Sequence, residues 1–417
     1  MDLLNEKESN QSNRLHHLDW LRVIAIGLLV LFHTGMIYVP EWGFHFKHES
    51  QSTLLQHLML TLSPWRMGLL WFISGVALRF MLLKKSSGKL LLSRSRRLLF
   101  PLLIGILIVV PPQLYIEMKQ AGKMPLDFWS FIHAFYFEPR NYFDAYQSGI
   151  WPHIDVNHLW FLRALWKYSV ALLLFSILFE RTPLHIKKWI QKAATSVSGK
   201  LSALSITLIV STLLIENLLI GDDVREIYGL LFLLVGFSLG NVSSFWSKLS
   251  VSLPQVAILA LVSLTAFQFG YSYIWQTGLY KSSDTAALIL RIIYASAKTM
   301  PVLAILAIAS RYLNRKSSII SELNRWVFPV YIIHQTIIIV VASVLSSFSM
   351  PLVLEGITVL ISTVMLCCLG MLILKYSTIL QVSFGIKPVI TSSYHTSCIW
   401  RTIVTICCIP LALELIY

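Results

Sequence analysis

Residues 18–33 read LDWLRVIAIGLLVLFH, a run of ten apolar residues with Arg22 before it and His33 after it. A helix needs about 20 mostly apolar residues to cross the hydrocarbon layer of a bilayer, and we predict such a span over residues 18–39. Arg22 and His33 are eleven positions apart. This is about three helical turns, so both lie on one face with an axial separation of about 16 Å. Because ionisable side chains are costly inside a span, both are candidate functional residues, and Asp19, one turn before Arg22, is placed to pair with it.

Further apolar runs of similar length follow along the chain. Of the 417 residues, 56% are hydrophobic and 13% are charged, and the mean hydropathy is +0.69. Because the runs are continuous rather than alternating, they predict transmembrane helices and not the strands of a barrel. We therefore expect an all-α, polytopic transmembrane bundle with ten core helices. The predicted spans are 18–39, 62–83, 98–116, 158–179, 201–220, 227–246, 254–275, 286–309, 326–347 and 351–374, with a shorter eleventh apolar run at 398–416.

The loops between these spans alternate in charge. The net charge of +14 comes largely from short loops, which indicates membrane topology rather than nucleic-acid binding. The basic loops follow spans 2, 4 and 8, and the positive-inside rule places them and the N-terminus in the cytoplasm. Their basic residues are Lys84, Lys85, Lys89, Arg94, Arg96 and Arg97, then Arg181, Lys187, Lys188, Lys192 and Lys200, and then Arg311, Arg315, Lys316 and Arg325. The first 14 residues lack the pattern of a cleaved signal peptide.

The longest predicted loop, 117–157, then lies on the outer side of the membrane. Its aromatic residues admit two interpretations. Aromatic faces pack on sugar rings, so the loop would hold carbohydrate; alternatively, the same residues form the aromatic belt at a membrane surface. These residues are Trp129, Tyr136, Tyr142, Tyr146 and Trp151.

The five cysteines lie in or beside apolar runs, at Cys367, Cys368, Cys398, Cys407 and Cys408. Their spacing matches neither a disulfide framework nor a zinc site, and we expect buried free thiols. His45 and His48 lie in an outer loop, and a lone pair of histidines is weak support for a metal. We accordingly predict no metal site and no tightly bound cofactor.

Short motifs along the predicted spans occur in a distinctive order. They are LDWLR…FH at 18–33, Trp65-Arg66 followed by WFISGV at 71–76, SRSRRL at 93–98 with Pro101, PPQ at 111–113, NHLWFL at 157–162, PVYIIH at 329–334 and FGIKP at 384–388. This order resembles the acyltransferase 3 family of polytopic membrane proteins, and within it the osmoregulated periplasmic glucan succinyltransferases. The resemblance covers residues 15–388, which we predict to be one membrane acyltransferase domain. Residues 389–417 would be a C-terminal extension that carries the further apolar segment.

The resemblance implies a ten-helix membrane enzyme that transfers an acyl group from cytoplasmic acyl-CoA to a hydroxyl of an extracytoplasmic or lipid-linked glycan. The acyl group would be succinyl or acetyl. The implied localisation is the inner (cytoplasmic) membrane, and the implied partners are acyl-CoA as donor substrate, the glycan acceptor and the lipid bilayer, with no nucleic acid.

Three histidines are the candidate catalytic residues. His33 is the predicted general base, because a neutral imidazole accepts a proton near pH 7 and a low-dielectric site favours the neutral form. His334, in the middle of the ninth predicted span, is the rival base. His158, at the outer mouth of the fourth, would orient the acceptor or assist proton transfer. The alternative for His33 is a structural hydrogen bond to a neighbouring helix.

Arginines are the candidate donor-binding residues. The guanidinium fork fits phosphate, and the resemblance assigns Arg22, Arg94 and Arg97 to the phosphates of CoA. The alternative is that these arginines are ordinary topology signals at the inner membrane surface.

Seven further residues are candidates for substrate binding: Asp19, Arg66, Ser74, Gly75, Trp160, Arg163 and Lys298. For Ser74 and Gly75, close helix packing by small residues is the favoured interpretation. Arg163 and Lys298 should line a wet cavity or meet acidic groups rather than lipid. They would hold either the free carboxylate of a succinyl group or the pyrophosphate of CoA.

Two other classes of function remain open. A secondary transporter of a small anionic solute also places ionisable side chains inside its spans, although it does not explain the order of the motifs. A structural partner in a glycan-export complex would need no catalytic base and would tolerate the loss of His33.

Overall fold

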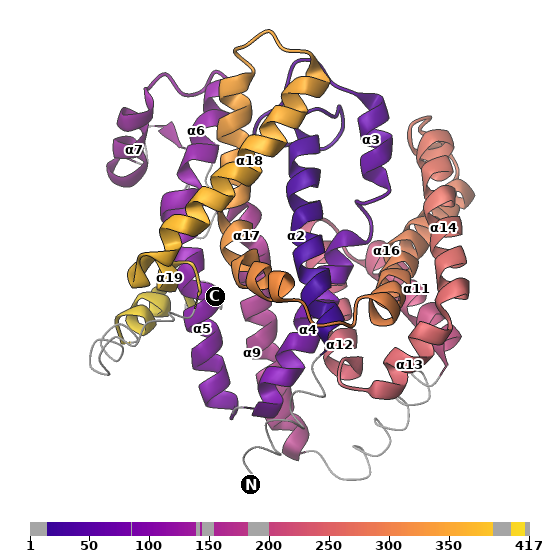
Figure 1. Ribbon diagram of the computed structural model, residues 1–417. Coiled ribbons are helices and arrows are strands. Elements are labelled where there is room, and N and C mark those ends of the chain that lie inside the picture. The colour runs from indigo at the N-terminus through magenta and orange to yellow at the C-terminus, as the bar shows by residue number, and fades with distance from the viewer. Residues whose placement is uncertain are drawn as a thin grey trace. The chain divides into compact units, whose positions relative to one another are not determined.

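The computed structural model describes residues 15–84, 86–138, 142–143, 154–181, 200–386 and 402–412, with the backbone alone for residues 87 and 176–181. In these ranges every element of regular structure is a helix (Figure 1), which confirms the all-α prediction. Eight stretches among them are long and apolar enough to cross a membrane, and one bent pair of helices would make a ninth span. The chain is therefore a multi-pass membrane protein, while the count of ten core helices stays a prediction.

The candidate spans follow the predicted apolar runs. They are α2 (His16–Met36), α4 (Arg66–Lys84), the stretch Gly88–Gln120, α11 (Leu201–Leu218), the stretch Leu253–Trp275, α16 (Asp284–Tyr312), α17 (Ser318–Leu345) and α18 (Leu352–Lys375). The first of the two stretches comprises α5 (Ser87–Ile104), the π-helical η1 (Gly105–Val109) and α6 (Pro111–Gln120), and the second comprises α14 (Leu253–Gly270) and the π-helical η4 (Tyr271–Trp275). The other helices are α3 (Thr53–Leu60), α7 (Phe128–Phe137), the 3-10 turn η3 (Asn157–Leu159), α9 (Trp160–Arg181), α12 (Asp222–Leu239), α13 (Ser243–Val251), α15 (Leu279–Ser282), α19 (Thr378–Ser383) and a helix over Thr402–Ala412.

One predicted span is broken. Residues 227–246 were expected to form one helix, but α12 ends at Leu239 and α13 continues after a bend of 107°. A side chain at Gly240 would collide with the methyl groups of Val76, so glycine allows the close approach at the break. Trp246 Nε1 donates a hydrogen bond of 3.0 Å to the Gly240 carbonyl, which satisfies a backbone acceptor that the helix end leaves exposed.

Some sequence predictions fall outside the described residues. They concern Lys85, Tyr146, Trp151, Lys187, Lys188, Lys192, Lys387, Pro388 and Cys398, and the side chain of Arg181. The cysteines within the described ranges, Cys367, Cys368, Cys407 and Cys408, are free thiols as expected. Cys367 and Cys408 are buried, whereas the expected burial is wrong for Cys407, which is half-buried, and for Cys368, which is exposed.

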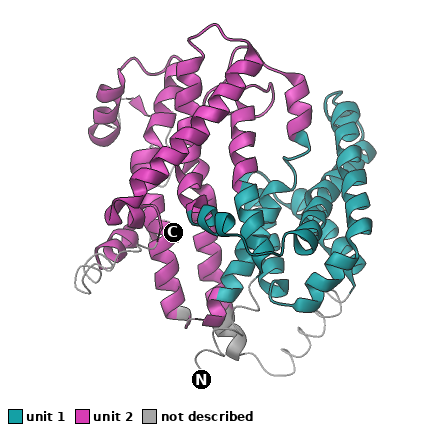
Figure 2. Cartoon of the chain, viewed as in Figure 1, with its two compact units in different colours: residues 1–25, 60–80, 183–325 teal, residues 26–59, 81–182, 326–417 magenta. Residues whose placement is uncertain are grey.

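The chain divides into two compact units (Figure 2), and each is described by itself. Unit 1 comprises residues 1–25, 60–80 and 183–325, and unit 2 comprises residues 26–59, 81–182 and 326–417.

In unit 1, helices α4 and α12 pack with their backbones in close contact. A Cβ atom added to Gly75 would collide with the backbone carbonyl of Leu233, and one added to Gly236 would collide with the carbonyl of Phe72. Small residues allow this approach inside a membrane, where close packing rather than hydrophobic burial holds helices together. The structure thus favours the packing interpretation of Gly75.

In unit 2, an apolar cluster holds the second half of α2 against α17 and α18. It contains Val30, Ile37, Ile338, Ile339 and Val359, all of them buried. Tyr38 belongs to the same cluster, and its hydroxyl donates a 3.0 Å hydrogen bond to the buried carboxylate of Glu355 on α18. The end of α2 that carries His33 is therefore fixed by packing on two neighbouring helices.

A second cluster in unit 2 joins α6 to α7. The buried side chains of Met118, Phe131 and Phe135 form its centre. Asp127 caps the first turn of α7, where its Oδ1 accepts from the backbone nitrogens of Trp129 and Ser130 at 2.9 and 3.2 Å. The predicted outer loop 117–157 thus contains a helix, and Trp129 stays 77% exposed on it. Both interpretations of the aromatic surface remain open.

We predict that Gly75→Ala destabilises the protein by about 1–3 kcal/mol, because the added methyl group forces the α4 and α12 backbones apart. Thermal unfolding in detergent, followed by tryptophan fluorescence, measures this change. The matched control is Gly27→Ala on α2, where the new Cβ meets no atom within 4 Å. There the higher helix propensity of alanine should stabilise by up to about 1 kcal/mol. Equal melting temperatures for both variants would contradict the close α4–α12 contact.

Candidate active site

The three predicted catalytic histidines come together in unit 2. His33 on α2 places its Nδ1 atom 3.0 Å from Nε2 of His334 on α17, and the planes of the two rings lie within 10° of each other with their centroids 5.1 Å apart. The ring of His158, from η3, meets the ring of His334 edge-on at 5.6 Å. His158 and His334 are buried, and His33 is half-buried. Segments more than a hundred residues apart in the sequence thus form one cluster of imidazoles.

Backbone carbonyls determine where the protons of the His33–His334 pair lie. His334 Nδ1 is 2.7 Å from the Tyr331 carbonyl oxygen and 3.1 Å from that of Val330. A carbonyl oxygen only accepts, so His334 Nδ1 donates, and Nε2 of the neutral ring accepts. His33 Nδ1 must then donate to His334 Nε2. We therefore assign the lone pair of neutral His33 to its Nε2 atom.

His158 is held in a different tautomer. Its Nε2 donates to the Ile332 carbonyl at 2.8 Å, so its Nδ1 carries the lone pair. That Nδ1 lies 3.3 Å from the side-chain nitrogen of Gln113, which donates to it. Both ring nitrogens of His158 are thus engaged within the protein, and this arrangement argues against the role of a general base.

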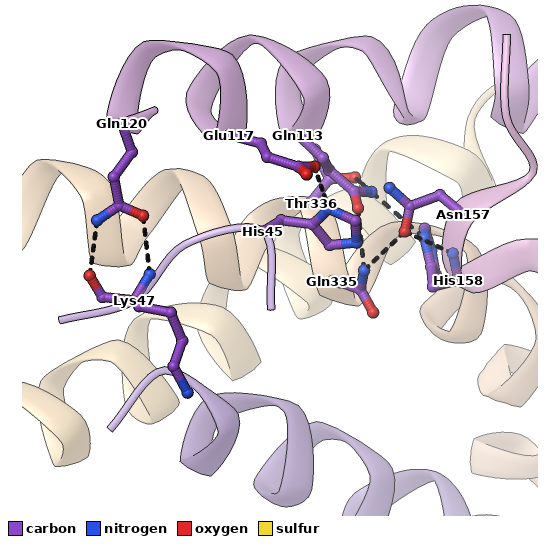
Figure 3. A network of polar contacts seen from close by, with 9 residues as sticks. All are labelled: His45, Lys47, Gln113, Glu117, Gln120, Asn157, His158, Gln335 and Thr336. Atoms are coloured by element: carbon purple, nitrogen blue, oxygen red, sulfur yellow. Dashed lines mark hydrogen bonds and ion pairs between the residues drawn. The ribbon is translucent and has the colours of Figure 1, made fainter. Parts of the chain in front are cut away.

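Buried amides extend the histidine cluster into a polar network (Figure 3). Gln335 Nε2 donates to Gln113 Oε1 and to Asn157 Oδ1, both at 3.0 Å, and Gln113 Nε2 also donates to Thr336 Oγ1. Asn157 adopts a positive φ of 48°, which asparagine tolerates better than most residues, and its Oδ1 caps the His158 backbone nitrogen at 2.7 Å. A buried network whose members are hydrogen-bonded to one another is rigid.

Several members of this network were not predicted from the sequence to be site residues. Gln113 and Asn157 lay inside motifs, but neither was taken as a site residue. Gln335 and Thr336 follow His334 directly in an otherwise apolar span. The feature that could have revealed them is the run of three consecutive polar residues, His334 to Thr336, inside a membrane helix. Each of these side chains would be costly there without a hydrogen-bond partner.

The predicted donor-binding arginines of α5 have different surroundings. Arg94 is buried, and its Nε and Nη2 atoms donate to Ser169 Oγ on α9 at 3.2 and 3.1 Å. Arg97 is exposed, and its backbone carbonyl oxygen lies 3.1 Å from the position that a Cβ atom at Gly385 would take. Between them, Arg96 donates to Thr405 Oγ1 at 2.8 Å. Phosphate binding by Arg94 and Arg97 stays a prediction.

The other candidate residues of unit 2 lie at the start of α9. Trp160 and Arg163 are both half-buried and one helical turn apart. The neighbouring Phe161 contacts the ring of Tyr331, the residue whose hydroxyl donates to the His158 carbonyl.

Five candidates of unit 1 lie on α2 and α4, and one of them, Gly75, packs against α12 as described above. Arg22 Nη1 lies 3.2 Å from Asp19 Oδ1, which confirms the expected pairing, and Asn324 donates to the same oxygen at 2.9 Å. On α4, Arg66 is buried and Ser74 is half-buried. Since the structure describes the units separately, a shared substrate site for these residues and the histidines stays a prediction.

Lys298, the remaining candidate of unit 1, has an acidic partner. Its ammonium group forms an ion pair with Glu216 on α11 and lies over the rings of Tyr228 and Tyr294, 4.1 and 4.9 Å from their centroids. The sequence predicted that Lys298 would either line a wet cavity or meet an acidic group, and in the structure it meets the acidic group of Glu216. Sequence alone gave no sign that Glu216 would be the partner.

Among the described residues, no group of three or more His, Cys, Asp and Glu side chains is arranged to hold a metal ion. The imidazole and amide groups of the cluster can transfer protons and form hydrogen bonds.

Comparison with known families identifies the class of protein. A family model described as an acyltransferase domain matches residues 15–374. The chain belongs to the acyltransferase 3 family. Its acyltransferase domain includes every candidate site residue, from Asp19 to His334, and the chain is an acyltransferase of the membrane. No curated protein and no solved structure matches the chain.

We predict that Ser169→Ala destabilises this acyltransferase by about 1–3 kcal/mol, because it leaves two buried N–H groups of Arg94 without their acceptor. Ser169→Thr keeps the hydroxyl and should lose less. The control is Ser263→Ala: Ser263 is also buried, but it donates to Ala260 of its own helix. Thermal unfolding of the three variants compares them. If Ser169→Ala melts like Ser263→Ala, the Arg94–Ser169 contact does not stabilise the fold.

Proposed function

We propose that the protein is an O-acyltransferase that uses His33 as general base. The acyl group, succinyl or acetyl, moves from cytoplasmic acyl-CoA to a hydroxyl of an extracytoplasmic or lipid-linked glycan. The observation that carries the proposal is the His33–His334 hydrogen bond, because it directs the lone pair of a neutral imidazole to His33 Nε2. The same bond argues against His334 as the base, since both of its ring nitrogens are engaged.

The reaction then needs one proton-transfer group. His33 Nε2 takes the proton of the acceptor hydroxyl as the hydroxyl oxygen attacks the thioester carbonyl, and a C–O bond forms. The tetrahedral intermediate collapses, the C–S bond breaks, and the imidazolium returns the proton to the leaving thiolate. His33 ends neutral, and the products are the glycan ester and free CoA. During the cycle, His334 accepts from His33 Nδ1–H and stabilises the imidazolium.

The donor would enter from the cytoplasmic side, where Arg22, Arg94 and Arg97 are proposed to hold the phosphates of CoA. Arg22 and His33 share α2, and helical rise separates them by about 16 Å. A pantetheine arm is long enough to cover a distance of this order and to present the thioester near His33. The glycan acceptor would approach from the other side of the inner membrane, with the N-terminus in the cytoplasm. His158 would act on the site indirectly, through its edge-on contact with the ring of His334.

We predict that His33→Ala leaves acyl-CoA binding nearly unchanged and lowers the melting temperature, because buried His334 Nε2 loses its donor, while the transfer rate falls by about 10²-fold or more, the usual scale for the loss of a general base. Transfer from radiolabelled acetyl-CoA or succinyl-CoA to glycans of the cell envelope measures the rate. His334→Gln retains an acceptor for His33 Nδ1–H and should lose less activity than His334→Ala.

The opposite result for the two variants would identify His334 on α17 as the general base. If His33→Ala turns over at a near-normal rate while His334→Ala is inactive, His334 is the base. If neither variant is impaired and the protein moves a small anion across vesicles without consuming acyl-CoA, the transporter alternative is correct.

We predict that Arg97→Ala and Arg22→Ala each weaken acyl-CoA binding by about 10-fold, since a charge-assisted hydrogen bond contributes about 1.5 kcal/mol or more. The control is Lys316→Ala, which removes an exposed cation from another basic loop. Isothermal titration of the purified protein with a non-hydrolysable acyl-CoA analogue reports the affinities. Affinities equal to that of Lys316→Ala would show that the arginines are topology signals.

A further inference from the structure

A stripe of polar residues runs along one face of α6. Gln113, Glu117 and Gln120 are four and three positions apart, so they share a face of the helix, and all three side chains leave it on the same side (Figure 3). The opposite face carries Met118, which packs on α7. Burial decreases along the stripe: Gln113 is fully buried, Glu117 is half-buried, and Gln120 is exposed. The stripe thus leads from the histidine cluster towards the surface of unit 2.

The loop that follows α2 lies against this stripe. His45 Nδ1 is 2.5 Å from Glu117 Oε2, and Lys47 exchanges two hydrogen bonds with Gln120 through its backbone, at 3.0 and 2.6 Å. The preceding residue, Phe44, places its ring 5.9 Å from that of His33. His45 of this pair therefore directly follows Phe44, whose ring lies beside the proposed base His33.

The loop does not need the His45–Glu117 pair as an anchor. Lys47 Nζ already caps the end of α2, where it donates to the carbonyl oxygens of Met36 at 2.7 Å, Trp42 at 3.2 Å and Val39. A cation is favourable at a helix C-terminus. Together with the exchange between Lys47 and Gln120, these contacts fix the loop on both sides, so the pair is available for another role.

The two side chains of the pair are suited to binding hydroxyl groups. They keep 26% and 36% of their surface exposed, although they lie beside a buried network. A carboxylate offers about four lone-pair positions, and the contact with His45 occupies one of them. The remaining positions accept O–H donors, and the hydrogen bonds of an ionised acceptor are roughly twice as strong as neutral ones.

We propose that Glu117 and His45 form a binding subsite for a polyhydroxylated acceptor, that is, for a carbohydrate. A sugar ring held there through one or two hydroxyls would direct a further hydroxyl past Phe44 towards His33. This inference rests on the proposed acyl transfer to a glycan. It extends that proposal by assigning recognition of the acceptor to Glu117 and His45.

The chain offers a matched control. His133 on α7 and Glu138, which directly follows α7, form a similar ion pair at 3.3 Å with both side chains exposed. Neither residue lies on the α6 stripe. Glu117→Gln and Glu138→Gln therefore remove the same charge from the same kind of pair at two different places.

The test compares binding and transfer in the full-length protein. Binding of a soluble gluco-oligosaccharide is measured without donor, and transfer from acetyl-CoA and succinyl-CoA is measured to that oligosaccharide and to ethanol. Glu117→Gln should weaken oligosaccharide binding and raise its KM about 10-fold, equivalent to about 1.4 kcal/mol. Transfer to ethanol and the KM of the donor should not change, since ethanol has no second hydroxyl for the subsite. Glu138→Gln should match the wild type throughout.

Other outcomes separate the subsite from the proposed function. An equal loss of transfer to the oligosaccharide and to ethanol would mean that the pair only supports the fold, and would overturn the subsite. Normal binding and transfer by Glu117→Gln, or a wild type that binds no oligosaccharide, would also overturn it. A wild type that binds the oligosaccharide but transfers no acyl group would contradict the proposed function, and weaker binding by Glu117→Gln would still support the subsite.

Discussion

The hydrogen bond between His33 Nδ1 and His334 Nε2 directs the chemistry proposed for the cluster. Its polarity follows from two backbone carbonyls, because Tyr331 and Val330 accept from His334 Nδ1 and leave Nε2 to accept from His33. In a membrane, where water cannot replace a missing partner, such a constraint is strong. If His334 Nε2 donated to His33 instead, Nδ1 of neutral His334 would carry a lone pair, and the carbonyl oxygens of Tyr331 and Val330 would face it without a donor. The helix backbone of α17 thus determines which nitrogen of a distant histidine is basic.

Packing keeps the His33–His334 hydrogen bond formed, because it holds α2 and α17 in register. The buried cluster around Val30, Ile338 and Ile339 joins α2 to α17, and the ammonium group of Lys47 satisfies carbonyls where α2 ends. The amides of Gln113 and Gln335 then hold η3, and with it His158, against α17. Apolar contacts set the distance between the helices, and the polar network sets the orientation of the rings.

The membrane helices could be predicted from sequence, because a continuous apolar run has a direct energetic meaning. The ionisable side chain in such a run made His33 a candidate, and its catalytic role stays a prediction. The pairing of Asp19 with Arg22 was also predictable, since it is local to one helix turn. The partners of His334, Arg94 and Lys298 were not: His33, Ser169 and Glu216 lie 301, 75 and 82 positions away. The break after α12 was missed for a similar reason, because a side chain at Gly240 would collide with Val76 of α4, a residue distant in the sequence. Hydropathy reports the environment of a residue and not its partner.

The tautomer of His33 can be measured directly by ¹⁵N solid-state NMR of the histidine-labelled protein in lipid bilayers, with His33→Asn and His334→Asn used to assign the two rings. Neutral His33 and His334 should both show a protonated Nδ1 and an unprotonated Nε2, with a coupling across the Nδ1–H···Nε2 bond that disappears in either variant. A protonated Nε2 on His33 at neutral pH, with its Nδ1 accepting from His334, would contradict the proposed direction of proton transfer. The general base would then have to be another residue.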